Sequence, residues 1–389
     1  MRVAIFSNTY WPTVNGVAIS IANLRQGLQN LGHEVFVFAP APRDFDVSED
    51  QDHVYRFPSL PAPVAADYHL AFPVAPAVAR ELRHHDFDIV HTHHPMWVGA
   101  WGQWFARWMG VPLITTVHTQ YEIYSKLVPL PDPLVNGYLK VRVNSYCNRC
   151  DLVTTPAESS RQRLLKLGVT TPVEVIYNPT DLSPLWEADG SGVRAQFGAG
   201  PDDILLGYIG RLAPEKNLGA LLDAAEMFLP QAPSARLLLV GDGPSREGLQ
   251  RRAERMPCGD RILFAGRIEH SLIPDFDAAL DVFITPSMFE VQPLSFAEAL
   301  ATGTPIIAMD APGGNDMVEN GVNGRLVPPA EQGAGLARVV LEMLSDQQGF
   351  QAMRERAREW ANRYDRMTVV GRMLEAYERA QELHEAAEV

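Results

Sequence analysis

Residues 204–217, ILLGYIGRLAPEKN, join a continuous apolar run to a polar turn that begins at a glycine. An apolar run without alternation is typical of a parallel strand that is covered on both faces. Similar runs recur at 2–7, 34–38, 89–91, 113–117, 152–154 and 173–176, and then at 235–240, 262–264, 282–285, 305–308 and 325–327. Helical patterns separate these runs, so the sequence predicts an α/β fold with doubly wound parallel sheets.

The strands and helices form two series, separated between residues 178 and 201 by a segment rich in proline and glycine. This segment predicts a linker between an N-terminal domain, 1–178, and a C-terminal domain, 179–365. Residues 366–389 form one long, charged helical pattern, which we expect to pack back on the N-terminal domain. Ligands of open α/β sheets lie beyond the carboxyl ends of the strands, so two Rossmann-like domains predict a cleft between them.

Composition narrows the class of protein. The formal net charge of −14 argues against general nucleic-acid binding, which needs a basic surface. No apolar run approaches the roughly 20 residues that span a bilayer, and the first residues are typical of a buried strand rather than a signal peptide. Cys147, Cys150 and Cys258 are too few for a zinc site or a disulfide framework. We therefore expect a cytoplasmic protein with reduced thiols.

Residues 287–303, SMFEVQPLSFAEALATG, carry two carboxylates, Glu290 and Glu298. A helix that starts near Pro293 would present free backbone N–H groups, which together form an anion site. Carboxylates only accept hydrogen bonds and can each hold a pair of vicinal hydroxyls. The alternative is two solvated glutamates on a surface helix.

Two cations, Arg211 and Lys216, follow the strand at 204–209 after a turn at Gly210. At the carboxyl end of a strand they can neutralise a departing diphosphate, whose charge grows in the transition state. The alternative is a surface loop in which Glu215 forms an exposed ion pair.

Two further segments place glycine or histidine after strands. Gly16 lies between the first strand and a helix, where backbone can approach a phosphate. Neither this segment nor Gly241 begins a complete G-x-G-x-x-G fingerprint, which removes the main support for an oxidoreductase. His118 ends another strand and suits a cleft, although a lone histidine is more often structural.

The histidines of DIVHTHHP at residues 88–95 have the residue type of metal ligands. The proline that follows them and the absence of a carboxylate partner argue against a metal site, and we predict none. We also predict no tightly bound cofactor, with Mg²⁺ at most a stimulant.

The segments GRLAPEKN, VGDGP, FAGRI, SMFEVQPLSFAEALATGTPIIA and NGRLVP, in this order, resemble the retaining GT-B glycosyltransferases related to sucrose and glycogen synthases. FSNTYWPTVNGVAISI, GHEVFVFAP, RFPSLP, HTQYEIY and CNRCD are similar to the bacterial 1,2-diacylglycerol 3-alpha-glucosyltransferases. Val291, Gln292 and Pro293 replace the threonine-glutamine-glycine run common in that branch, which leaves the donor sugar open.

The resemblance implies a retaining hexosyltransferase that moves glucose from UDP-glucose to a lipid such as diacylglycerol. It implies a catalytic set of His118, Arg211, Lys216 and Glu290. Donor-binding residues implied by it are Gly16, Gly210, Arg211, Lys216, Gly241, Arg267, Ile268, Glu290, Val291, Gln292, Pro293, Leu294, Ser295 and Glu298. Within these sets, the two cations would hold the diphosphate, Glu298 the ribose, and Glu290 and His118 the sugar. The family mechanism is a front-face substitution in which the leaving diphosphate helps to deprotonate the acceptor.

The acceptor and a membrane are expected to meet the N-terminal domain. The residues assigned to this role are Tyr10, Asn15, Tyr121, Tyr124, Lys140 and Arg142. Aromatic side chains suit the water–lipid boundary and cations attract anionic headgroups, which predicts a peripheral protein on the inner face of the plasma membrane. A stripe at helical spacing, Trp97, Trp101, Trp104 and Trp108, fits either the core face of a helix or a membrane contact.

Two alternatives remain open. One is the same chemistry with another donor, such as GDP-mannose, UDP-GlcNAc or UDP-galactose, and a soluble or different lipid acceptor. The other is a nucleotide-sugar epimerase or hydrolase, or a non-catalytic binder, on the same scaffold.

Overall fold

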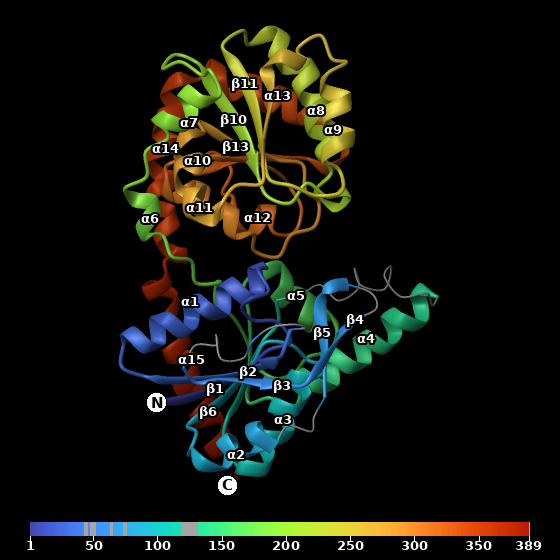
Figure 1. Cartoon of the computed structure of the whole chain (residues 1–389), viewed down its shortest axis with the longest axis vertical. Helices are drawn as coiled ribbons and strands as arrows, with labels where there is room; N and C mark the ends of the chain where they lie inside the picture. Colours follow the sequence, from blue (N-terminus) through green and yellow to red (C-terminus); the bar gives the residue numbers. More distant parts are fainter. Residues whose placement is uncertain (43–45, 47–51, 63–64, 73–75, 119–130, 389) are drawn as a thin grey trace. The chain divides into compact units, whose positions relative to one another are not determined.

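The computed structural model describes residues 1–42, 46, 52–62, 65–72, 76–118 and 131–388. These residues form two compact units (Figure 1). Unit 1 comprises Met1–Pro179 and Arg366–Val389, and unit 2 comprises Thr180–Asp365.

Unit 1 is built on a seven-stranded sheet in the order β3-β2-β1-β6-β7-β8-β9. Every neighbouring pair in this sheet is parallel. The strands are β1 (Arg2–Phe6), β2 (Glu34–Pro40), β3 (Val54–Phe57), β6 (Ile89–Thr92), β7 (Leu113–Thr116), β8 (Leu152–Thr155) and β9 (Val173–Val175). A separate antiparallel pair, β4 (Ser59–Ala62) and β5 (Ala65–Ala71), follows β3.

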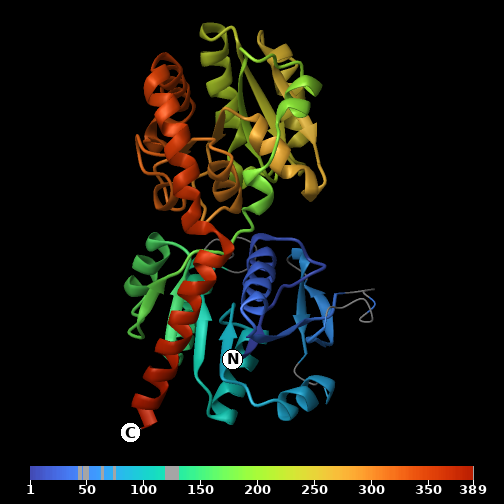
Figure 2. The same cartoon turned by 90° about the vertical axis from the view of Figure 1, so that its left-hand side faces the viewer.

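Helices cover both faces of this sheet because alternate strand residues are apolar on both sides. Val3 and Ile5 belong to one core cluster, whereas Ala4 and Phe6 belong to the other. The first cluster is covered by α1 (Gly16–Asn30) and α15 (Arg366–Glu388), which lie side by side (Figures 1 and 2). The other face carries α2 (Pro76–His84), α3 (Val98–Met109), α4 (Asp132–Cys147) and α5 (Glu158–Lys166).

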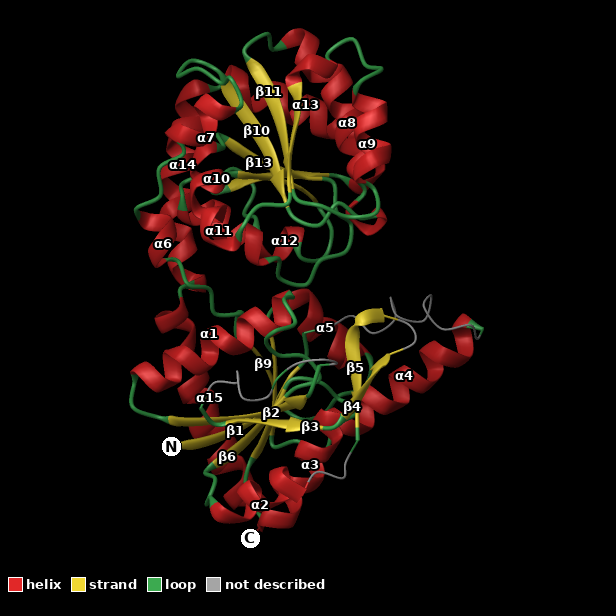
Figure 3. Cartoon of the chain, in the orientation of Figure 1, coloured by secondary structure: helices red, strands yellow, loops and turns green. Residues whose placement is uncertain are grey.

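Unit 2 repeats the design with a six-stranded parallel sheet in the order β12-β11-β10-β13-β14-β15. Its strands are β10 (Ile204–Ile209), β11 (Ala235–Val240), β12 (Ile262–Gly266), β13 (Val282–Thr285), β14 (Ile306–Met309) and β15 (Gly324–Val327). Helices flank the sheet on both sides (Figure 3). They are α6 (Ser183–Trp186), α7 (Ser191–Gln196), α8 (Leu218–Phe228), α9 (Arg246–Ala253), α10 (Ile273–Ala279), α11 (Leu294–Ala301), α12 (Gly314–Met317), α13 (Gln332–Ser345) and α14 (Gln347–Ala361).

The strand orders fix where each unit can bind a ligand. The chain reverses its direction of travel across the sheet between β1 and β6 in unit 1, and between β10 and β13 in unit 2. Ligands of open α/β sheets bind beyond the carboxyl ends of the strands at such a switch point. The two doubly wound parallel sheets confirm the predicted fold class, and the predicted Arg211 and Glu290 segments follow the two strands of the unit 2 switch point.

None of the helices in the described part of the chain is both long and apolar enough to cross a membrane.

Candidate functional site

The carboxyl edge of the unit 2 sheet brings together the loops that follow its four adjacent strands β12, β11, β10 and β13. The Gly210 amide donates to the Val240 carbonyl at 3.0 Å, and the Gly241 amide donates to the Gly266 carbonyl at 2.8 Å. Gly241 has a φ of 130°, and an added Cβ would lie 1.9 Å from the Gly210 carbonyl oxygen. Glycine is required there because the loops approach so closely.

The Lys216 ammonium reaches across this edge to the Glu290 carboxylate, with Nζ 2.6 Å from Oε1. Their side chains are only 23% and 16% exposed, so solvent screens this pair less than a surface ion pair. Asn217 joins the same two loops through a 3.4 Å hydrogen bond from its amide to the Pro286 carbonyl. In the absence of a ligand, two predicted donor-binding groups therefore neutralise each other.

Arg211 points to solvent and lies 3.9 Å from Glu215, with its side chain 67% exposed. The ion pair that the sequence offered as an alternative role is therefore present. A long, exposed pair of this kind contributes little stability and leaves the guanidinium accessible to an anion.

The Glu290 loop is held by a second glycine turn. The Glu290 amide donates to the Pro312 carbonyl at 3.3 Å, and a Cβ on Gly313 would lie 2.3 Å from the Glu290 Cβ. Helix α11 begins a few residues later at Leu294, where Pro293 is the N-cap and provides no side-chain hydrogen bond. The first-turn amides of α11 thus have no side-chain cap, which suits an anion at this helix start.

Two carboxyls lie behind this helix start. Glu298 is half-buried on α11, and burial raises the pKa of its carboxyl. Asp277 on α10 is fully buried, and neither carboxyl oxygen has a hydrogen-bond partner in the described structure. Burial and the neighbouring charge of Glu298 raise the pKa of Asp277 well above its usual range.

The remaining predicted donor residues of unit 2 lie at the same edge. Arg267 is exposed and Ile268 half-buried, directly after β12. Val291, Leu294 and Ser295 are half-buried at the start of α11. Gln292 is buried there. The structure thus gathers at one switch point all the predicted donor residues except Gly16 and His118, which belong to unit 1.

Gly16 is the first residue of α1 in unit 1, and Asn15 caps that helix. The Asn15 Oδ1 accepts from the Ala18 amide at 2.9 Å, and its Nδ2 donates to Thr9 Oγ1 at 2.9 Å. A Cβ on Gly16 would meet nothing within 4 Å, so packing does not require glycine there. The open space leaves this helix start accessible to a ligand.

His118 belongs to a buried group with the three histidines of the HTHHP segment. His91, His93, His94 and His118 are exposed by only 0%, 2%, 6% and 8%. Burial lowers the pKa of His91 and His94 to about 3 and of His118 to about 4, and it lowers that of His93 well below its usual range. The four imidazoles are therefore neutral at pH 7.

The predicted acceptor residues are distributed over unit 1. Tyr121 and Tyr124 lie outside the described residues. Tyr10 is buried with its hydroxyl accepting from Arg25 at 3.2 Å, which are the contacts of a structural residue. Its role toward an acceptor, like that of every predicted site residue, stays a prediction.

The tryptophan stripe of α3 is not a core face. Trp101 packs against Phe57 with 4.9 Å between ring centroids, but Trp97, Trp104 and Trp108 are 49%, 66% and 56% exposed. The buried face consists instead of Val98, Gly99, Gly102, Gln103, Phe105 and Ala106, and α3 lies close to the sheet at Gly102. A Cβ on Gly102 would lie 2.7 Å from a Thr92 methyl and 2.8 Å from the Phe6 ring. The core interpretation is therefore wrong for three of the four tryptophans.

Sequence reasoning missed Asp277 and the structural part played by His93. Asp277 could have been found because it lies on the apolar stripe of its helix, four residues after Ile273 and three before Leu280. A carboxyl group on the buried face of a helix calls for an explanation, because burying a charge without a partner is costly. His93 could have been paired with His118, because both directly follow strands that prove adjacent in the sheet.

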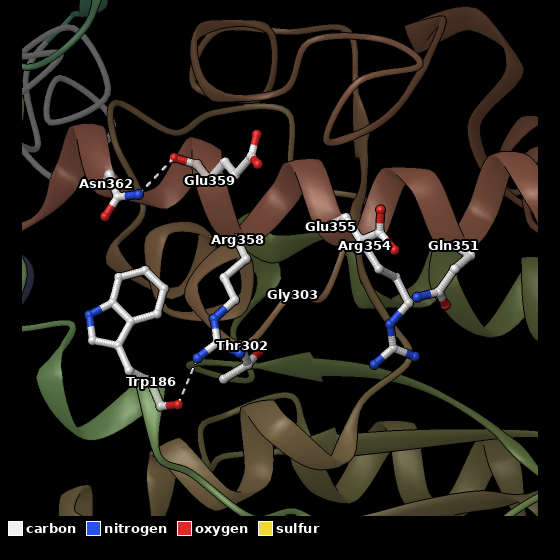
Figure 4. Close-up of a pocket in the computed structure, with 9 residues that line it drawn as sticks. All are labelled: Trp186, Thr302, Gly303, Gln351, Arg354, Glu355, Arg358, Glu359 and Asn362. Atoms are coloured by element: carbon white, nitrogen blue, oxygen red, sulfur yellow. Dashed lines mark hydrogen bonds between the residues drawn. The ribbon is translucent and has the colours of Figure 1, made fainter.

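A polar pocket of about 520 Å³ lies in unit 2 at the opposite end of α11, between α6 and α14 (Figure 4). The Arg358 guanidinium donates to the Trp186 carbonyl at 2.8 Å and lies 5.4 Å from the centre of its ring. Arg354 donates to Asp281 at 2.9 Å. Both arginines of the pocket are thus held by protein groups, and the pocket is separate from the switch point.

Within the described residues, no group of three or more histidine, cysteine, aspartate or glutamate side chains is arranged to hold a metal ion.

Two family models match the chain in tandem. Residues 14–184 match Glycosyltransferase Family 4, and residues 192–360 match Glycosyl transferases group 1. An alpha-monoglucosyldiacylglycerol synthase of Streptococcus pneumoniae is 30% identical over 331 residues, which cover 84% of this chain and 75% of that protein.

The names of other relatives state other donors or acceptors. A GDP-mannose-dependent alpha-mannosyltransferase of Corynebacterium glutamicum is 28% identical and covers 84% of this chain and 76% of that protein. A D-inositol 3-phosphate glycosyltransferase of Geodermatophilus obscurus is 31% identical and covers 69% of this chain and 64% of that protein.

The fold is also that of a solved structure with bound UDP. Anabaena HepE in complex with UDP superposes with a TM-score of 0.77 at 24% identity, covering 97% of this chain and 100% of that chain. The resemblance predicted from the sequence motifs is thereby confirmed. The chain belongs to the GT-B glycosyltransferases, with a Glycosyltransferase Family 4 domain in its first half and a Glycosyl transferases group 1 domain in its second.

Proposed function

We propose that this glycosyltransferase is a retaining enzyme that transfers glucose from UDP-glucose to a lipid acceptor such as diacylglycerol. The observation that carries the transfer chemistry is the unit 2 switch point, where Arg211, Lys216 and Glu290 meet the uncapped start of α11. The choice of glucose and diacylglycerol rests on the similarity to the alpha-monoglucosyldiacylglycerol synthase of Streptococcus pneumoniae.

We assign a part to each group at this edge. A diphosphate at the start of α11 would be neutralised by Arg211 and by Lys216, which would exchange the Glu290 carboxylate for phosphate oxygens. Glu290 would then be released to accept hydrogen bonds from sugar hydroxyls, while Glu298 accepts from the ribose. Because the negative charge on the diphosphate grows as the glycosidic bond breaks, both cations bind the transition state more tightly than the ground state.

The proposed reaction is a front-face substitution. The bond between C1 of the sugar and the diphosphate oxygen breaks and its electron pair stays on that oxygen. The acceptor hydroxyl oxygen bonds to C1 on the same face, and its proton passes to a departing phosphate oxygen. The anomeric configuration is thereby retained without a covalent enzyme intermediate.

The outer face of α4 in unit 1 supports a lipid surface as the site of the acceptor. Leu134, Tyr138 and Val141 are exposed at spacings of four and three residues, whereas Leu139 and Val143 on the opposite side are buried. The helix is therefore apolar on both sides, which a purely water-facing helix would not be. Lys140 is an exposed cation elsewhere on the same helix, and the protein would act peripherally on an anionic membrane at the cytoplasmic side.

Another donor is the second candidate. The GDP-mannose dependence named for one relative and the Val291-Gln292-Pro293 departure both favour testing it. Purified protein should be incubated with each of UDP-glucose, UDP-galactose, UDP-GlcNAc and GDP-mannose, in the presence of diacylglycerol micelles, inositol 3-phosphate or water alone. Chromatography and NMR of the product, which distinguish hexose epimers of equal mass, then decide between the two candidates. A glucosylated lipid supports the proposal, a mannosylated or soluble product supports the second candidate, and free sugar or an epimerised nucleotide contradicts both.

A further inference from the structure

The buried histidines of unit 1 include one direct imidazole–imidazole hydrogen bond. His93 Nδ1 lies 2.8 Å from His118 Nε2, and the two rings stack with centroids 5.1 Å apart. His93 directly follows β6, and His118 lies two residues after the neighbouring strand β7, so both lie at the carboxyl edge of the sheet. This contact joins a residue without an assigned role to one that the resemblance places in the catalytic set.

The position of His93 is fixed from several sides. Its ring stacks on His91 with centroids 4.2 Å apart, and His91 is itself held by Tyr377 at 2.9 Å and Thr116 at 2.7 Å. The turn after His93 is also tightly packed, because a Cβ on Gly99 would lie 1.6 Å from the His94 carbonyl oxygen. His93 is thus a rigid partner rather than a mobile side chain.

Two neutral imidazoles that share a hydrogen bond have only two possible proton arrangements. Either His93 Nδ1 carries the proton and donates to a bare His118 Nε2, or the reverse holds. In the first arrangement His118 carries its own proton on Nδ1, and in the second that atom is bare. In either arrangement the shared hydrogen bond holds the His118 ring in place and ties its tautomer to that of His93.

We propose that His93 is a positioning residue: the hydrogen bond between its Nδ1 and His118 Nε2 holds His118 in one orientation and in a single tautomer. What His118 then contacts rests on the proposed function, but the tautomer does not. Because Nε2 is occupied, His118 cannot accept the acceptor's proton at that atom. The proton is left to the departing diphosphate, as the front-face reaction requires.

The test is nitrogen-15 NMR of the full chain labelled on histidine, with His118→Gln used to assign the His118 signals. Wild-type protein should show His118 in one tautomer between pH 6 and 8. His93→Leu removes the hydrogen-bond partner and should release His118 into a mixture of tautomers. His93→Asn keeps a hydrogen-bonding group near the position of Nδ1 and should restore the single tautomer. His94→Gln is the matched control, since His94 belongs to the same group but its Nδ1 accepts from the Asn8 amide instead.

Activity provides the second readout. His93→Leu should lower kcat about tenfold to a hundredfold while the KM for the nucleotide sugar changes little, because only the orientation of one sugar contact is lost. His93→Asn should recover most of that loss. A wild-type His118 that exists as a mixture of tautomers, or a His118 tautomer that His93→Leu leaves unchanged, overturns the proposal even in a protein that transfers no sugar. If the tautomer changes as expected and no donor is turned over, the proposed function fails and the positioning of His118 stands.

Discussion

The two units share one architecture but build their carboxyl edges from opposite chemistry. Unit 1 presents buried imidazoles without charge, held by hydrogen bonds and ring stacking. Unit 2 presents a partly buried ion pair, an exposed arginine and two carboxyls whose pKa values are raised. Under the proposed function, this difference fits a division of work in which unit 2 would receive a charged leaving group and unit 1 would keep fixed, neutral groups at its own edge.

The largest effect should come from removing a cation from unit 2. Arg211→Ala or Lys216→Ala should each lower turnover by at least about a hundredfold, the usual scale for one lost transition-state charge contact. Steady-state kinetics with the nucleotide sugar measure this. The matched control is Glu215→Gln, which removes the exposed partner of Arg211 and should leave turnover near wild type. Near-normal turnover in either cation variant would contradict the assignment of that cation to the leaving diphosphate.

Acidification should change the folding stabilities of the two units in opposite directions. In unit 1, the folded-state pKa values of His91, His94 and His118 lie below the unfolded value of 6.5, so the unfolded state binds more protons as pH falls. The stability of unit 1 should therefore fall between about pH 6.5 and 4, by about 1.4 kcal/mol per pH unit for each histidine. In unit 2, the raised pKa values of Asp277 and Glu298 mean that the folded state binds protons first. Its stability should rise as pH falls from neutrality toward about pH 4.

Urea unfolding followed by hydrogen exchange in each unit measures both slopes. Asp277→Asn should flatten the slope of unit 2 and leave that of unit 1 unchanged, while His91→Gln should reduce only the slope of unit 1. Parallel pH dependence in the two units would contradict this contrast.

A smaller effect should distinguish the two faces of unit 1. Lys140→Ala should weaken binding to anionic vesicles about fivefold, the scale of one cation near a charged membrane, and Tyr138→Ser should weaken it further. Vesicle sedimentation measures this. Arg372→Ala on α15, which covers the other face of the sheet, is the control and should bind as wild type. Arg142 is a poor target because its guanidinium lies over the Tyr146 ring at 5.8 Å. Equal binding by the Lys140 and Arg372 variants would remove α4 from the membrane contact.

The smallest effect should be that of metal removal. Because no described cluster of side chains suits a metal and the cations of unit 2 can neutralise the diphosphate, we expect a chelator to leave most of the activity. A complete loss that Mg²⁺ or Mn²⁺ restores would contradict this expectation, whereas mild stimulation would not.

Sequence patterns predicted the buried parallel strands because runs such as 204–209 are apolar throughout, and only burial on both faces accounts for that. They failed at the β4–β5 pair, because proline and polar residues at 59–71 are typical of a loop. The donor segments were found because each follows a strand, so the strand order alone brings them together.

Contacts that depend on three-dimensional packing were not predictable in this way. The exposure of Trp104 follows from how closely Gly102 lies against Phe6, which helical spacing does not report. The pairing of Lys216 with Glu290 joins residues far apart in the sequence, and the hydrogen bond between His93 and His118 depends on ring orientation.

One measurement tests the central claim most directly: the structure of the product formed from UDP-glucose and diacylglycerol by the purified wild-type protein, determined by NMR at the anomeric carbon. The account predicts a single glucosyl diacylglycerol in the α configuration, whose formation Lys216→Ala suppresses by at least about a hundredfold. A β-linked product, or consumption of UDP-glucose that yields only free glucose or an epimerised nucleotide sugar, would contradict it.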